Sequence, residues 1–311
     1  MNQSGQTALD GPQTIAVSGS TGLIGGALVA SLRADGHRVK CLVRRQPRDG
    51  QDEIFWDPVT YKIDKDALVG VDAVVHLAGA NVASRRWTRA QKKRIRVSRI
   101  EGTRLLCGSL AWLENKPRTL VSASAIGFYG DRADELLDEQ SEPGDGFLSE
   151  VCHAWERATE PATDVGIRTV NLRIGVVLSP EGGALKKMLT PFRLGLGGVI
   201  GSGLQYVSWI ALCDVVGAVR HALATPSLSG PVNAVSPRAI SNRELTKTLG
   251  RVLRRPTLFP MPALAARIVF GQMGKELLLS STRVRPARLN ETGYQFQHPE
   301  LDGALRHLLD K

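Results

Sequence analysis

Short apolar runs alternate with longer amphipathic stretches along the first half of the chain. Five segments rich in β-branched and other apolar residues predict strands: residues 14–18, 39–43, 73–77, 120–123 and 169–174. Three longer segments repeat their apolar residues at helical spacing and predict helices: residues 24–35, 88–113 and 147–163. Strands and helices in this order are typical of βαβ units, whose right-handed crossovers build parallel sheets. The pattern therefore predicts the α/β fold class, with a doubly wound Rossmann-type sheet.

The pattern of residues along the chain changes after Gly182. A glycine-rich segment, residues 195–203, is followed by shorter elements that prolines separate. We expect residues 14–180 to form the dinucleotide-binding domain, which also receives later strands, and residues 181–311 to form mainly a smaller C-terminal α/β lobe for the substrate. Residues 1–13, which are mostly polar and contain glycine, are expected to form a disordered tail.

One helix of the smaller lobe has a clear start signal. Ser241-Asn242-Arg243-Glu244 has the residue order of a capping box, in which the serine and glutamate side chains satisfy free backbone N–H groups. The predicted helix begins there and runs to about Leu253, before Pro256 stops it.

A glycine-rich turn joins the first predicted strand to the first predicted helix. Glycines at positions 19, 22 and 25 permit a tight turn, a close approach of backbone to a pyrophosphate, and close packing of helix on strand. The free N–H groups at the helix start then favour an anion. The bare pattern is weak, but its place between strand and helix makes it specific. The predicted cofactor contacts in this loop are Gly19, Ser20, Thr21, Gly22, Leu23, Ile24 and Gly25.

The end of the second predicted strand indicates which dinucleotide binds. An enzyme that uses NAD usually has Asp or Glu there to accept the ribose hydroxyls, whereas one that uses NADP has Arg. This chain has Arg44 and Arg45 at that place, about 20 residues after Gly25. A guanidinium pairs bidentately with a 2′-phosphate. We therefore predict NADP(H) as the cofactor in preference to NAD(H), the alternative being two solvated arginines.

Composition excludes several other classes of protein. The chain has 311 residues, of which 42% are hydrophobic and 23% charged, as expected for a globular protein with a full core. No stretch reaches the roughly 18 consecutive apolar residues of a membrane span, and no signal peptide is evident. The four cysteines are far apart, so neither a disulfide framework nor a metal site is predicted. A reducing cytoplasm is the expected compartment.

A net charge of +10 raises the question of an anionic partner. Residues 85–99 contain eight basic side chains around a single aromatic one, Trp87. Platforms that stack nucleic-acid bases need several aromatic residues. We interpret the run as a solvated helix face that also serves an anionic cofactor, and we expect neither nucleic acid nor a membrane as partner.

Several further motifs resemble one family. His76-Leu77-Ala78-Gly79 and the segment from Ser122 to Gly130 (SASAIGFYG) resemble the extended short-chain dehydrogenase/reductases. More specific blocks are similar to the NAD(P)-binding "epimerase family protein" group and its characteristic C-terminal domain: Arg86-Trp87-Thr88, Ala154-Trp155-Glu156, residues 177–184, residues 191–198, residues 230–234 and Arg254-Arg255-Pro256. The resemblance covers residues 14–309.

The resemblance implies more of the cofactor site. The strand end formed by Leu77, Ala78 and Gly79 should touch the cofactor, and Arg99 should reach its phosphates. We also expect Ser122 among the cofactor contacts. Members often dimerise through two long helices, so this protein is a possible homodimer through residues 88–113 and 147–163.

The catalytic residues are where this chain departs from the family's pattern. Most of the superfamily uses a Tyr-x-x-x-Lys pair, in which the lysine lowers the pKa of the tyrosine, and a serine that holds the reacting oxygen. Ser124 stands where that serine is expected, but the helix that should supply the pair has Phe147 and Val151. Tyr129 is a candidate substitute acid, with a structural turn as the alternative.

Three further positions bear on activity. The literal Tyr-x-x-x-Lys at residues 61–65 precedes the strand at 73–77 and is interpreted as a chance match. Ala80 and Ala211 stand where similar proteins have Glu and His, so two ionisable groups are missing from the expected cleft. Two hypotheses follow: an NADP(H)-dependent oxidoreductase or epimerase-like enzyme acting on an unknown small molecule, or a non-catalytic NADPH-binding sensor or scaffold.

Overall fold

Within the residues that the computed structural model describes, Leu9 and 11–311, eight strands form one sheet in the order β12-β8-β6-β5-β1-β2-β3-β4. Residues 1–8 and 10 of the predicted tail lie outside this range. The strands are β1 (Thr14–Ser18), β2 (Arg38–Val43), β3 (Glu53–Asp57), β4 (Lys62–Ile63), β5 (Ala73–His76), β6 (Thr119–Ala125), β8 (Arg168–Ile174) and β12 (Gly230–Ala234). Every described pair in this sheet is parallel except β3 with β4. The predicted α/β fold with a parallel Rossmann-type sheet is confirmed.

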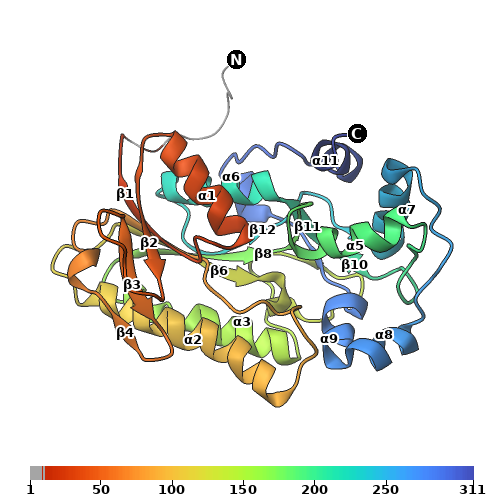
Figure 1. The fold of residues 1–311 in the computed structure, drawn as a ribbon, viewed down its shortest axis with the longest axis horizontal. Helices are drawn as coiled ribbons and strands as arrows, with labels where there is room; N and C mark the ends of the chain where they lie inside the picture. Colours follow the sequence, from red (N-terminus) through yellow and green to blue (C-terminus); the bar gives the residue numbers. More distant parts are fainter. Residues whose placement is uncertain (1–8, 10) are drawn as a thin grey trace.

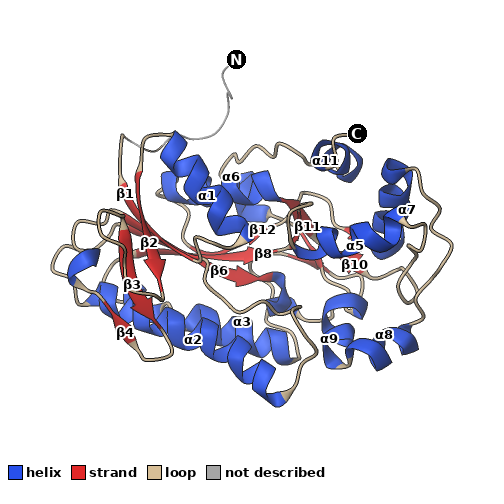
Figure 2. Cartoon of the chain, in the orientation of Figure 1, coloured by secondary structure: helices blue, strands red, loops and turns tan. Residues whose placement is uncertain are grey.

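Helices cover both faces of the sheet (Figures 1 and 2). On one face α1 (Leu23–Ala34) and α6 (Leu212–Ala224) pack side by side, and on the other α2 (Arg89–Ala111) packs against α3 (Phe147–Arg157) and α4 (Glu160–Thr163). The strands between the two layers are apolar on both faces, as a doubly covered sheet requires. Ile15 and Val17 of β1 face the layer with α1, whereas Ala16 faces the layer with α2, and all three are fully buried.

Two local predictions need correction. The predicted helix at 147–163 is two helices, because Pro161 lacks a backbone N–H and begins a new turn in α4 instead of continuing α3. Strands β3 and β4 were not predicted from the sequence. Both are short strands at the edge of the sheet, and the tight turn between them includes Tyr61 in a left-handed conformation, with φ of 57°.

Several elements of residues 181–311, the range expected to form mainly a smaller lobe, lie beyond the carboxyl ends of the parallel strands (Figure 1), and we call them the smaller lobe. Its helices are α5 (Gly183–Arg193), α7 (Asn242–Leu253), α8 (Ala263–Phe270), α9 (Gln272–Gly274) and α11 (Leu301–Leu308), whereas α10 (Ala287–Glu291) packs against β12 of the large sheet. Three two-stranded pairs accompany them: β7 (Leu136–Leu137) with β14 (Arg283–Val284), β9 (Val176–Leu178) with β11 (Trp209–Ala211), and β10 (Tyr206–Val207) with β13 (Ile240–Ser241). The Ser241 hydroxyl accepts a hydrogen bond from the Glu244 amide at 3.1 Å, so the predicted N-cap of α7 is present.

No described helix is both long and apolar enough to cross a membrane. Among the described residues no three His, Cys, Asp or Glu side chains gather as a metal site, and the four cysteines are free.

Candidate cofactor and active site

The glycine loop connects β1 to α1 with a geometry that excludes side chains. Gly19 has φ of 68°, and a Cβ there would lie 2.9 Å from the Leu77 backbone. A Cβ on Gly25 would lie 2.1 Å from the Gly19 carbonyl oxygen, which no real structure tolerates. The first turn of α1 carries no acidic side chain, so its free N–H groups are left to an external anion. This geometry is compatible with a pyrophosphate, and the cofactor contacts of the loop stay a prediction.

Arg44 and Arg45 follow β2 directly, and their environments differ. Arg45 forms a bidentate ion pair with Glu53 of β3, in which Nη1 donates to Oε2 at 2.8 Å and Nη2 bonds to Oε1. This pair lowers the pKa of the Glu53 carboxyl. The exposed Arg44 side chain has no hydrogen bond or ion pair with any described residue. Of the two predicted arginines, only Arg44 therefore remains available for a 2′-phosphate.

The carboxyl end of β5 approaches the glycine loop. The Ser18 hydroxyl accepts hydrogen bonds from the amides of Leu77 and Ala78, at 3.1 and 3.2 Å, and so fixes the chain where it leaves the sheet. Gly79 then passes under the Arg99 guanidinium, whose carbon would lie 3.2 Å from a Cβ at that position. Predicted contacts from three segments are thus brought together at the carboxyl ends of the central strands β1 and β5.

The Arg99 guanidinium is a cation without an acidic partner among the described residues. It stacks over the Trp155 ring at 4.9 Å from the ring centroid, and Nη1 donates to the Ala80 carbonyl at 2.9 Å. Desolvation lowers its pKa. A neighbouring anion would offset this cost of burial, which suits the predicted contact with a cofactor phosphate.

Ser124 lies at the end of β6, where a nicotinamide ring is expected. Its hydroxyl donates a hydrogen bond of 2.6 Å to Glu156 Oε1 of α3. Glu156 is itself held by Arg173 of β8, whose Nε and Nη2 donate to the two carboxylate oxygens at 2.8 Å each. The side chains of Arg173 and Glu156 are only 4% and 12% exposed. The partner of Ser124 is therefore an anchored carboxylate and not a tyrosine.

Tyr129 is fully buried, and its hydroxyl is occupied on both sides. It accepts from Arg173 Nη1 at 2.9 Å and donates to Asn233 Oδ1 at 2.7 Å. Burial raises the pKa of Tyr129 to about 12. The proton of this buried phenol is committed to Asn233, which argues against a direct role of Tyr129 as an acid.

Apolar side chains that pack in the protein core stand where the superfamily has its Tyr and Lys. The Phe147 ring contacts the Trp87 ring at 5.1 Å between centroids, and the Val151 side chain is 1% exposed in the same cluster. Ala80 donates its amide to Ser98 Oγ at 3.0 Å, and Ala211 is fully buried at the start of α6. No ionisable side chain stands at any of these four positions.

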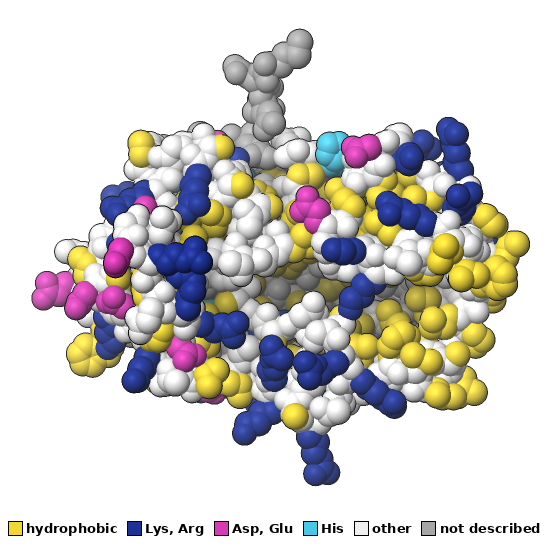
Figure 3. All heavy atoms as spheres, viewed as in Figure 1, with side chains coloured by type: hydrophobic (Ala, Val, Ile, Leu, Met, Phe, Trp, Pro, Cys, Tyr) yellow, Lys and Arg dark blue, Asp and Glu magenta, His cyan; other side chains and the backbone are white. Residues whose placement is uncertain are grey.

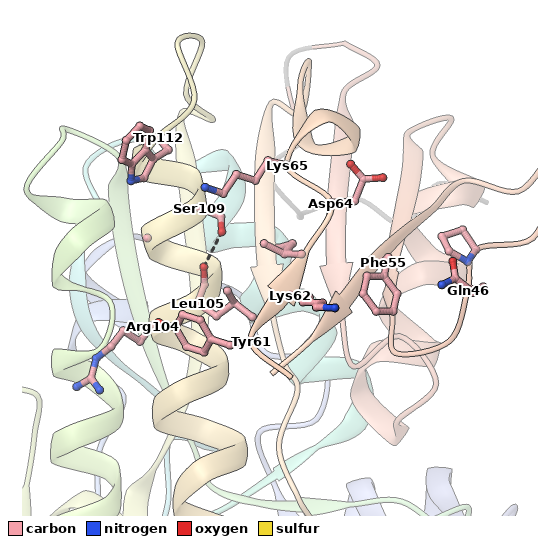
Figure 4. Close-up of a pocket in the computed structure, with 13 residues that line it drawn as sticks. Gln46, Phe55, Tyr61, Lys62, Asp64, Lys65, Arg104, Leu105, Ser109 and Trp112 are labelled. Atoms are coloured by element: carbon pink, nitrogen blue, oxygen red, sulfur yellow. Dashed lines mark hydrogen bonds between the residues drawn. The ribbon is translucent and has the colours of Figure 1, made fainter. Parts of the chain in front are cut away.

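The literal Tyr-x-x-x-Lys lies elsewhere, as interpreted from the sequence. Tyr61 and Lys65 line a shallow groove of about 760 Å³ between the β3–β4 hairpin and the end of α2 (Figure 4). There the Lys65 ammonium lies over the exposed Trp112 ring, at 5.2 Å from its centroid. A groove at this edge of the sheet is separate from Ser124, which lies at the carboxyl end of the central strand β6.

The network also contains residues that the sequence analysis did not select. The sequence analysis named Glu156 only within the motif Ala154-Trp155-Glu156, and Arg173 only within the strand predicted at residues 169–174. The position of a charged residue inside an apolar central strand could have indicated a buried ion pair. The Asn233 backbone N–H donates to the buried Glu139 carboxylate at 3.0 Å, which extends the network to the segment that follows β7. Ser122 is fully buried within β6, and its predicted contact with the cofactor stays a prediction.

Comparisons with known proteins identify the family of the chain. A model of the NAD dependent epimerase/dehydratase family matches residues 15–235, and a domain of unknown function (DUF1731) matches residues 261–308. An epimerase family protein of Mycobacterium bovis is 46% identical over 291 residues, which are 94% of this chain and 96% of that protein.

Two solved structures share the fold at high sequence identity. The crystal structure of human epimerase family protein SDR39U1 (isoform 2) with NADPH superimposes with a TM-score of 0.86 and 36% identity, covering 96% of this chain and 99% of that one. The nucleoside-diphosphate sugar epimerase from Corynebacterium glutamicum has a TM-score of 0.81 and 38% identity, covering 97% of this chain and 59% of that one. The family resemblance expected from the motifs is confirmed: the chain belongs to the NAD-dependent epimerase/dehydratase family, is similar to the epimerase family proteins, and carries the DUF1731 domain at residues 261–308.

Proposed function

We propose that this chain binds NADPH and uses it as an oxidoreductase or epimerase-like enzyme on a small carbonyl or hydroxyl compound. The pairing of Arg45 with Glu53 carries the choice of NADP(H), since it leaves the exposed Arg44 guanidinium free beside the expected ribose. The NADPH in the human relative supports the same cofactor. Gly19 to Gly25 would hold the pyrophosphate, and Arg99 a phosphate or ribose oxygen nearby.

The nicotinamide ring supplies hydride transfer when the cofactor is bound. The residues of this chain must then move one proton. In the oxidising direction the substrate hydroxyl gives its proton to Ser124 Oγ, while the Ser124 proton passes along the 2.6 Å hydrogen bond to Glu156 Oε1. The reverse transfers serve reduction. Glu156 thus acts as general base through Ser124, in a chain whose helix α3 lacks the superfamily's Tyr-x-x-x-Lys pair.

Arg173 and Tyr129 have supporting roles in this proposal. Arg173 fixes both oxygens of Glu156, so that one lone pair faces Ser124. Tyr129 holds the remaining Arg173 nitrogen and is a positioning residue that does not touch substrate. Tyr129 is expected to help orient the Glu156 carboxylate through Arg173 and not to transfer its own proton.

A second function has one observation in its favour. Ser124 is only 2% exposed, and phenylalanine and valine replace the usual catalytic pair. A protein of this kind could bind NADPH as a sensor or scaffold and present a changed surface to a partner. In that case the cofactor binds and no substrate is turned over.

Calorimetric titration with NADPH and NADH tests the cofactor. We expect NADPH to bind at least about tenfold more tightly than NADH, or about 1.4 kcal/mol. Arg44→Asp should abolish this preference. Arg45→Ala is the matched control and should retain it, because Arg45 is already paired. Equal binding of both dinucleotides by the parent protein would contradict the assignment.

A carbonyl substrate screen, followed by NADPH absorbance, then separates the two functions. Any turnover found should fall at least about a hundredfold in Ser124→Ala and in Glu156→Gln. NADPH affinity should persist in both variants. Cofactor binding without turnover, together with partner capture that depends on NADPH, would favour the sensor.

A further inference from the structure

The smaller lobe exposes an unusual concentration of apolar side chains. Eight of the fourteen large apolar side chains that are exposed in the described residues lie in two segments, residues 194–204 and 258–269. Each of these eight is between 54% and 71% exposed. We call these two segments the apolar face. Single exposed apolar residues are ordinary, but a gathering of this kind marks an interaction site.

The two segments lie side by side. The Met261 amide donates to the Val199 carbonyl at 2.8 Å, and the Gly201 amide returns a bond of 2.9 Å to the Met261 carbonyl. On α8, Leu264 and Ile268 are one turn apart, with the exposed Arg267 between them on the same side. The apolar face is thus one surface made by a glycine-rich loop, an extended segment and a helix.

The two stretches of chain that carry the apolar face contain basic but no acidic residues. Residues 182–205 and 245–275, which contain the two segments, include nine Lys and Arg residues and no Asp or Glu. Among the described residues only Arg251 of these nine forms an ion pair, with Asp302. Figure 3 shows the result: dark blue and yellow side chains share the right half of the molecule, whereas most acidic side chains in this view lie on the left.

The combination of exposed apolar and basic side chains indicates which kind of partner the apolar face binds. A second copy docked through the same surface would bring two sets of cations together with no carboxylate to pair them. A nucleic acid would find one exposed aromatic ring, Phe259, on which to stack a base. An anionic lipid bilayer meets both features, because the apolar side chains enter the acyl boundary while the arginines and lysines contact lipid phosphates.

We propose that the apolar face docks the protein peripherally on an anionic lipid bilayer. Docking of this kind needs no spanning helix, so it is compatible with the lack of one among the described residues. It revises the expectation, drawn from the sequence, that no membrane is involved. The proposal is independent of the cofactor and of any catalytic activity.

Co-sedimentation of the full chain with vesicles tests the proposal. We expect binding to vesicles that contain phosphatidylglycerol, no binding to vesicles of phosphatidylcholine alone, and weaker binding at high salt. Leu264→Glu combined with Ile268→Glu should lower the partition coefficient by at least about tenfold. Arg254→Glu combined with Arg255→Glu should lower it similarly, by reversing two charges.

The matched control places the same two new charges elsewhere. Val59→Glu combined with Val69→Glu changes exposed valines at the opposite end of the molecule and should leave vesicle binding unchanged. NADPH affinity checks the fold of every variant. Absence of binding that depends on phosphatidylglycerol, or equal loss in the control, would overturn the proposal. So would a concentration-dependent dimer that Leu264→Glu with Ile268→Glu dissociates, since the occupant would then be a second copy.

Discussion

Replacing Arg173 by leucine should show how much the buried ion pair between Arg173 and Glu156 contributes to the free energy of unfolding. The side chain is 4% exposed and donates three hydrogen bonds, two to Glu156 and one to the Tyr129 hydroxyl. Its guanidinium also lies 3.4 Å from the centroid of the Phe128 ring. In Arg173→Leu the Glu156 carboxylate stays in the interior with no cation, and Tyr129 loses a donor.

The expected cost follows from that uncompensated charge. Removing one partner of a buried pair costs about 3 to 5 kcal/mol, out of a typical unfolding free energy of about 5 to 15 kcal/mol. An unfolding entropy of about 2.1 cal/mol/K per residue, over 311 residues, is ~0.65 kcal/mol/K. The melting temperature should therefore fall by about 5 to 8 °C.

Guanidinium unfolding and scanning calorimetry measure this loss. Glu156→Met combined with Arg173→Leu should recover most of the stability, because it removes both charges and leaves apolar groups. Arg157→Leu is the matched control: it breaks the exposed pair with Glu160, 3.3 Å apart, and should have almost no effect. A loss below about 1 kcal/mol in Arg173→Leu, or a double variant weaker than the single one, would refute the reasoning.

Three further predictions concern separate parts of the chain. Gly25→Ala should abolish NADPH binding and destabilise the fold, because its Cβ would overlap the Gly19 carbonyl; calorimetry and thermal melting measure both, and retained binding would contradict the loop geometry. Burial raises the pKa of Glu139 above its ordinary 4.5, so its stabilising contribution is full below that pH and declines as the pH rises through the raised value. Glu139→Gln should therefore gain stability over the parent at pH 8 but not at pH 4, as judged by denaturant midpoints, and a gain that is equal at both pH values would show that charge is not the cause. Ser241→Ala should cost about 1 kcal/mol by leaving the Glu244 amide without its cap, and an unchanged unfolding midpoint would count against that role.

Local patterns in the sequence were sufficient to predict the main elements of the fold. The helix expected at 88–113 is α2 (Arg89–Ala111), and its N-cap, Thr88, accepts a bond from the Gln91 amide at 3.2 Å. The glycine loop was predictable for the same reason, since its strand, turn and helix are contiguous. Such features depend on residues that are neighbours along the chain.

The Ser124 environment was not predictable in this way. Glu156 comes 32 residues after Ser124, and Arg173 a further 17 residues on, so only the folded sheet brings them together. The different environments of Arg44 and Arg45 likewise depend on Glu53, which belongs to a strand that the sequence analysis missed. Side-chain partners across strands are set by register, and periodicity alone does not fix that register.

The order in which the sheet is synthesised differs from the order in which it is assembled. Strand β8 is complete at Ile174, but its outer neighbour β12 ends only at Ala234, about 60 residues later. At about 5 to 20 residues per second, a ribosome leaves that β8 edge without a partner for roughly 3 to 12 s. An apolar, unpaired edge invites strand addition from other nascent chains. Chaperone dependence during translation should therefore be greatest in this interval, and truncation of the chain near residue 180 should yield an aggregating product in place of an isolated nucleotide-binding domain.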